Sequence, residues 1–144
     1  MKATFTIVLA IACSLASLSL FGQESEITGI QFENEEISIS TDFLDCVSNS
    51  NGTAKQYLNI SVENNLNSPV EVSFHKELWY GGACVNCGNL TDEYLVELKL
   101  EAGETVSSDC ESSKHLKIFF KMLELKNVRQ LSHYELKNIT VKKL

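Results

Sequence analysis

The feature that most constrains this chain is a hydrophobic period of two residues. Apolar and polar side chains alternate over many short stretches, among them YLNISVEN at 57–64 and PVEVSFHKELWY at 69–80. Successive side chains of a β-strand point to opposite faces, so this alternation is typical of strands that bury one face and expose the other. No stretch of useful length has the 3.6-residue period of an amphipathic helix.

The same alternation predicts which apolar side chains form the core. An earlier strand is expected over 37–43, and a late strand is expected from Tyr134 onward. The phase of the late strand slips at Asn138 and resumes at Ile139, which is the pattern of a β-bulge. Neighbours of the core residues in sequence are expected to be exposed. The expected core residues are Leu58, Ile60, Val62, Val72, Phe74, Val96, Leu98, Ile118 and Phe120.

Turn-forming residues separate these stretches. They include NNLNSP at 64–69, GGACVNCGN at 81–89, EAG at 101–103 and CESS at 110–113. The only proline, Pro69, opens a strand, where its missing N–H costs least. Short strands at this spacing predict an all-β fold, an antiparallel β-sandwich of about 7–8 strands.

One part of the chain resembles a known kind of module. The stretch LNISVENNLNSPVEV at 58–72, followed by LKLEAGET at 98–105, is similar to bacterial extracellular immunoglobulin-like and fibronectin-III-like modules. The resemblance covers roughly residues 56–110, and it implies an immunoglobulin-like sandwich in a small secreted protein. The resemblance implies no particular activity, because this fold hosts many unrelated functions. The cysteines of this chain depart from the usual module.

The first residues have the composition of a secretory signal peptide. Lys2 precedes an apolar run that ends at Phe21, and a polar, acidic stretch follows. We expect a signal peptide over residues 1–22 and a single domain over 23–144. A lipid anchor at Cys13 is less favoured, because the apolar run continues past that cysteine. The prediction is a secreted, periplasmic or cell-envelope protein with no membrane span in the mature chain.

Removal of the signal peptide leaves four cysteines, Cys46, Cys84, Cys87 and Cys110. An even number in an exported chain favours two disulfides. The preferred pairing is Cys84–Cys87 with Cys46–Cys110, and the two crossed pairings stay open because spacing does not fix connectivity. Glycines flank Cys84 and Cys87, whereas a redox-active pair of this spacing usually begins a helix. A simple meander places all four cysteines at one end of the domain.

Two further functions for these cysteines stay open as alternatives. The four thiolates together form a possible zinc or copper site. Cys84 and Cys87 alone form a possible thiol-redox pair. Disulfides remain the favoured interpretation, because free thiolates in an oxidising compartment are oxidised unless a metal binds them.

The loop that contains Cys84 and Cys87 is also the candidate binding surface. Aromatic side chains on a loop held by a rigid scaffold are typical contact residues. The chain is therefore expected to be a non-enzymatic binding or adhesion module for a protein or glycan partner. The residues expected to form this surface are Trp79, Tyr80, Gly81, Gly82 and Asn86.

Composition and motifs exclude several other classes. The chain has no glycine-rich phosphate loop, no H-E-x-x-H pattern and no EF-hand calcium loop, so we expect no catalytic residue and no cofactor. His75, His115 and His133 alternate with core positions and are expected to point to solvent. A net charge of −7 argues against nucleic acid as a partner. Basic residues concentrate over 114–144 and are expected to face acidic strands across the sheet.

Overall fold

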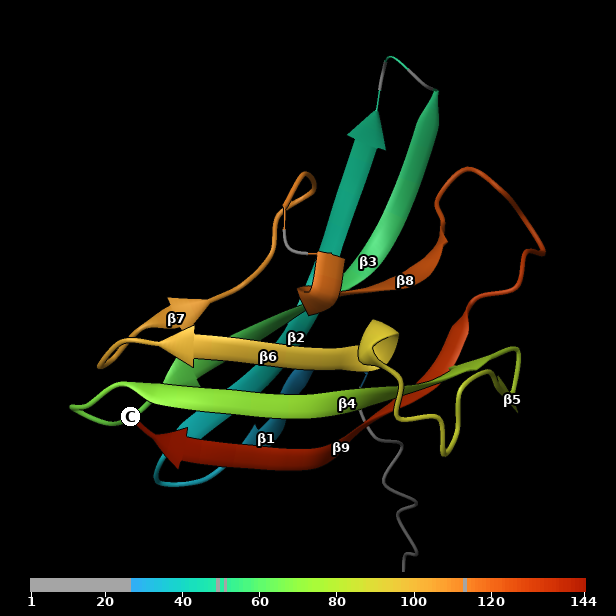
Figure 1. Cartoon of the computed structure of the whole chain (residues 1–144). Coiled ribbons are helices and arrows are strands. Elements are labelled where there is room, and N and C mark those ends of the chain that lie inside the picture. Colours follow the sequence, from blue (N-terminus) through green and yellow to red (C-terminus); the bar gives the residue numbers. More distant parts are fainter. Residues whose placement is uncertain (1–26, 49, 51, 113) are drawn as a thin grey trace, which may run out of the picture.

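A computed structural model describes residues 27–48, 50, 52–112 and 114–144 of the chain (Figure 1). The predicted signal peptide lies outside these residues. The described part contains strands and two short 3-10 turns but no α-helix, which confirms the all-β prediction. The turns are η1 (Asp92–Tyr94) and η2 (Lys114–Leu116). The strands are β1 (Gly29–Glu33), β2 (Ile37–Ser48), β3 (Thr53–Asn64), β4 (Val70–Tyr80), β5 (Ala83–Cys84), β6 (Leu95–Leu100), β7 (Thr105–Val106), β8 (Lys117–Met122) and β9 (Leu131–Lys143).

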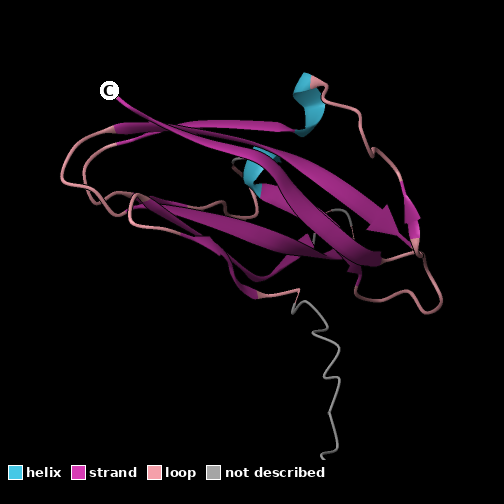
Figure 2. Cartoon of the chain, turned by 90° about the horizontal axis from the view of Figure 1, so that it is seen from below, coloured by secondary structure: helices cyan, strands magenta, loops and turns pink. Residues whose placement is uncertain are grey.

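The strands form two antiparallel sheets, which Figure 2 shows as two layers. In the five-stranded sheet the order is β1-β2-β3-β7, and β8 also pairs with β3. In the four-stranded sheet β9 pairs with one edge of β4, and β6 and β5 pair with successive parts of the other edge. One of the sheets is curled into a half-barrel. The chain passes from the first sheet to the second between β3 and β4, the two central strands.

The predicted phase of the core is confirmed with one exception. All the expected core side chains are buried except Leu98, which is half-buried. Along β4 the burial alternates from Val70 to Trp79, with Val70, Val72 and Phe74 fully enclosed. The hydrophobic period therefore reports the side of each strand that faces the second sheet.

The predicted bulge in the late strand is confirmed as well. Ser73 pairs with Thr140 and His75 pairs with Lys137, so Phe74 alone lies opposite two residues of β9. One of these two, Asn138, has a φ of 53°. Asparagine adopts this left-handed conformation more readily than most residues, which explains the slip in the hydrophobic phase.

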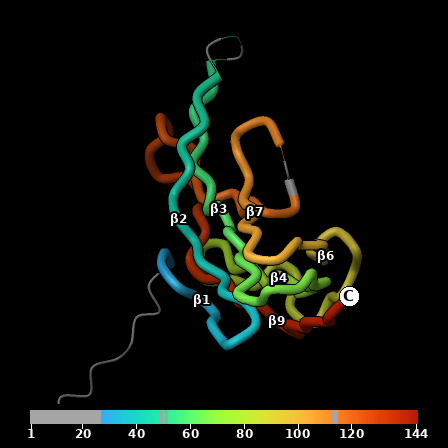
Figure 3. The backbone as a smooth tube through the Cα atoms, turned by 90° about the vertical axis from the view of Figure 1, so that its left-hand side faces the viewer, coloured from blue at the N-terminus to red at the C-terminus, as the bar shows by residue number. Residues whose placement is uncertain are grey.

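Two residues of the five-stranded sheet differ from the prediction. Asn59 is buried, because the chain after β7 crosses over it and Ser108 donates two hydrogen bonds to its Oδ1. Phe43 has the phase of the core but is 47% exposed. The outer halves of β2 and β3 project as a hairpin away from the four-stranded sheet (Figure 3), so that sheet does not cover Phe43.

Candidate functional site

The loop between β4 and β5 is a tight turn built on two glycines. Gly81 and Gly82 have φ values of 59° and 81°, a backbone conformation that residues with a Cβ rarely adopt. After the turn, Cys84 pairs back with Trp79. Cys84 is bonded to Cys87 and Cys46 is bonded to Cys110, so the preferred disulfide pairing is confirmed.

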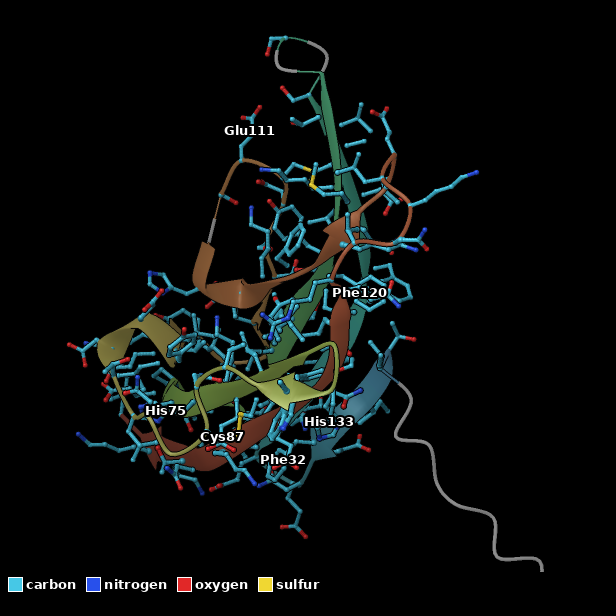
Figure 4. All side chains as sticks on the ribbon, turned by 90° about the vertical axis from the view of Figure 1, so that its right-hand side faces the viewer. Phe32, His75, Cys87, Glu111, Phe120 and His133 are labelled. Carbon is cyan, nitrogen blue, oxygen red and sulfur yellow. A yellow bond between two sulfur atoms is a disulfide. The ribbon has the colours of Figure 1, made fainter. Side chains whose placement is uncertain are left out.

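The predicted meeting of all four cysteines at one end of the domain is wrong. Figure 4 shows the two disulfides far apart, one beside the projecting hairpin near Glu111 and the other at Cys87. The hairpin diverges from β4, whereas the meander assumed that all strands run in line. Among the described residues, no group of three or more histidine, cysteine or acidic side chains is arranged to hold a metal ion. The four-cysteine ligand set is therefore not assembled.

Asn86 was expected on the contact surface but is buried, with 4% of its surface exposed. Its Nδ2 donates to the backbone oxygen of Lys76 (2.6 Å), and its Oδ1 accepts from the backbone N–H of Leu78 (2.7 Å). Along this edge of β4, β6 pairs as far as His75 and β5 pairs from Trp79 onward. The carboxamide of Asn86 fills the gap as a strand backbone would, so Asn86 has a structural role.

Tyr80 was also expected on the contact surface, but its side chain points into the protein. Its hydroxyl donates to the backbone oxygen of Phe119 in the opposite sheet, at 2.5 Å. Burial raises the pKa of Tyr80 to about 12. Tyr80 therefore ties the two sheets together.

Trp79 points the other way, to the outer face of the four-stranded sheet, where it is half-buried. Its ring lies 4.8 Å from the ring of His133 on the neighbouring strand β9. The Nε2 of His133 lies 3.2 Å from a carboxylate oxygen of Glu135, and Lys137 pairs with the same carboxylate. Hydrogen bonds from Lys137 and His133 lower the pKa of Glu135. We call Trp79, His133, Glu135 and Lys137 the Trp79 surface.

A cavity of about 300 Å³ opens beside the Trp79 surface, between β1 and β9. Its apolar lining includes Phe32 of β1 and Leu136 and Ile139 of β9, and His133 and Glu135 also line it. Figure 4 shows Phe32 and His133 at this position. The hydroxyl of Tyr134 is hydrogen-bonded to Ile27 and Thr41. The cavity therefore combines apolar side chains with a carboxylate and an imidazole.

Sequence reasoning identified only Trp79 among the residues of this surface. The alternation of β9 placed His133 and Glu135 on one face of one strand, and that signal was visible. The pairing of Trp79 with His133 depends on the register between β4 and β9, which are far apart in the chain. Of the three histidines, His115 is exposed as expected, and His75 and His133 are half-buried.

Lys76 is buried in the inward-facing row of β4, with 5% of its surface exposed. Its Nζ donates to the backbone oxygen of His115 at 2.5 Å. No carboxylate in the described part of the chain forms an ion pair with Lys76. Burial lowers the pKa of Lys76 to about 8, so this amine destabilises the folded chain at neutral pH.

Lys76→Met is expected to raise the free energy of unfolding at pH 7 by about 2 kcal/mol. The lowered pKa corresponds to a cost of roughly 3 kcal/mol, and the lost hydrogen bond offsets about 1 of it. The folded pKa lies below the ordinary value of 10.5, so the unfolded chain binds more protons between about pH 8 and 10.5. Wild-type stability should therefore rise with pH across this window, and the variant should lose that rise. Urea denaturation at pH 7, 9 and 10.5 measures both effects, and equal pH profiles for the two proteins would contradict the prediction.

No helix in the described residues is long and apolar enough to cross a membrane. No protein-family model, curated protein or solved structure matches this chain. Its function therefore has to be argued from its own residues.

Proposed function

We propose that this chain is a non-enzymatic, exported binding or adhesion module that contacts its partner through the Trp79 surface. The observation that carries the proposal is the half-buried indole of Trp79, which packs against His133 on the outer face of the sheet and lies beside a cavity. Tryptophan is enriched among residues that dominate binding energy. Here the supporting strands order the ring before a partner arrives, which lowers the entropy lost on binding.

An immunoglobulin-like topology is the second part of the proposal. In such sandwiches the second strand pairs with the first and fifth, while the third pairs with the sixth in the opposite sheet. Here β3 corresponds to the second strand, because it pairs with β2 and with β8. β4 corresponds to the third strand, because it pairs with β9 in the other sheet. This order supports the resemblance inferred from residues 56–110.

Export is the third part of the proposal. Two disulfides form readily in an oxidising compartment and rarely persist in a reducing one. They support the expected signal peptide and a secreted, periplasmic or cell-envelope location. Among the described residues, the disulfides leave no cysteine thiolate for a metal ion. Redox exchange at Cys84–Cys87 has no additional support from the surrounding residues.

The partner we propose is a glycan or an extended region of a protein surface. An indole face packs against the C–H groups of a sugar or against apolar side chains. The carboxylate of Glu135 and the imidazole of His133 offer hydrogen bonds to hydroxyl or amide groups at the rim of the ring.

The test uses the fact that Trp79 is the only tryptophan in the chain. The mature protein is screened against an array of glycans and extracellular proteins, and each hit is then titrated while tryptophan fluorescence is recorded. The emission of Trp79 is expected to change on binding, and Trp79→Ala is expected to weaken affinity about thirtyfold, as for a residue worth about 2 kcal/mol.

Leu125→Ala is the matched control, because Leu125 is an exposed apolar residue that is not part of the Trp79 surface. It should leave affinity unchanged. A partner that binds Trp79→Ala as tightly as the wild type would place the contact surface elsewhere.

A further inference from the structure

The outer half of β2 has an open edge. β1 pairs only with Ser38–Thr41, whereas β3 pairs with β2 along its whole length to Ser48. Residues 42–48 therefore have a strand on one side only, within the described part of the chain. Figure 3 shows this half of β2 rising past the end of β1. Its outward backbone groups are placed to receive a further strand.

This edge is regular, unlike the open edge of β9. The pairing of β2 with β3 has no register shift over its whole length. The pairing of β9 with β4 shifts twice, near Trp79–Tyr80 and near Ser73–His75. Bulges twist an edge and interrupt its pairing, so they protect a strand from addition of another. The outer half of β2 lacks bulges, and it contains neither proline nor lysine.

The inner face of this half-strand presents apolar groups to solvent. Phe43 is 47% exposed and Val47 is 66% exposed, with Asp45 between them. Phe43 packs on Phe120 at a ring distance of 5.0 Å, which fixes the position of its ring. An added strand would cover Phe43 and Val47 with its own alternate side chains.

The edge carries two acidic side chains, Asp42 and Asp45, that form no ion pair within the described residues. Asp42 and Asp45 accept hydrogen bonds from the neutral amides of Asn59 and Gln56. Neither aspartate forms an ion pair with a described lysine, arginine or histidine. A second copy of this chain, with its net charge of −7, would be repelled overall. A cationic segment would be attracted.

We infer that the outer half of β2, residues 42–48, is a docking edge for an extended cationic segment of a partner protein. The segment adds to the five-stranded sheet as a new strand and forms backbone hydrogen bonds with β2. Its lysine or arginine side chains lie on the face of Asp42, and its apolar side chains cover Phe43 and Val47 on the face that Asp45 shares. This edge is separate from the Trp79 surface, so the two contacts are independent.

The test titrates the mature chain with a capped seven-residue peptide of alternating lysine and valine. Amide hydrogen exchange, followed residue by residue by NMR, is expected to slow in 42–48 and to stay unchanged in β9. Affinity should fall as salt is raised, because the attraction is between exposed charges. The double variant Asp42→Asn/Asp45→Asn, which keeps both acceptor oxygens, is expected to bind about tenfold more weakly.

Glu97→Gln is the matched control, since it removes an exposed carboxylate from β6, which lies in the other sheet. It should bind the peptide as the wild type does. Val47→Lys places a cation on the docking edge and is expected to weaken binding even if the double variant folds poorly. Three results would overturn the inference. They are protection confined to β9, equal affinity for a peptide of alternating glutamate and valine, and a dimer in sedimentation analysis whose amide exchange is slowed in residues 42–48 without any peptide.

Discussion

Phe74→Ala is expected to lower the free energy of unfolding by about 3–5 kcal/mol, the usual range for a large aromatic residue removed from a packed core. Phe74 is fully buried at the middle of β4, and Val96 lies beside it on β6. On its other side, β9 bulges around it. Because bonded strands fix the backbone on both sides, the structure cannot collapse into the cavity that the substitution leaves, which favours the upper part of this range.

Phe43→Ala is the matched control for this substitution. It removes the same atoms from a side chain that is 47% exposed and makes one aromatic contact, with Phe120. A loss of about 1 kcal/mol is therefore expected. Urea denaturation of the three proteins measures the difference, provided that the slope against denaturant concentration is the same for all. Similar losses at Phe43 and Phe74 would show that the assigned inward face of the sheets is wrong.

The interior of this protein was predictable because burial has a local signature in the sequence. Alternation along β3 and β4 identified Leu58, Ile60 and Phe74, and a break in alternation identified the bulge at Asn138. Each strand has one solvent-exposed face and one buried face, so polar and apolar residues alternate between positions that are adjacent in the chain. Lys76 has the inward phase of this pattern, so its burial was also visible in the sequence.

The candidate site was less predictable, because it depends on how distant strands meet. Consecutive residues of a strand point to opposite faces, so the separation of Trp79 from Tyr80 was available from parity alone. The contact of Trp79 with His133 was not, since it requires the register of β9 on β4. The role of Asn86 required knowledge of the gap between β5 and β6 at the edge of β4. The separation of the two disulfides required the angle between the sheets.

The second large effect is expected from the Cys46–Cys110 disulfide. Its bond spans a sequence separation of 64 residues, so in the chain-entropy model it restricts the unfolded chain far more than the Cys84–Cys87 bond, with a separation of 3. The double variant Cys46→Ser/Cys110→Ser is expected to lose about 4 kcal/mol of stability, against about 1–2 kcal/mol for Cys84→Ser/Cys87→Ser. Urea denaturation of both variants under non-reducing conditions gives the comparison.

The two variants should also differ in the part of the fold that they loosen. Cys110 holds the segment that carries Ser108 over the buried side chain of Asn59, so loss of the long bond should speed amide exchange of Ser108. The short bond holds Asn86 against β4, so its loss should speed exchange at Leu78, whose N–H donates to the Asn86 side chain. A greater loss of stability from the short bond would mean that the Asn86 contacts outweigh the entropy of the long loop. Each disulfide would then act mainly through the native contacts beside it, and the chain-entropy account of the long bond would be wrong.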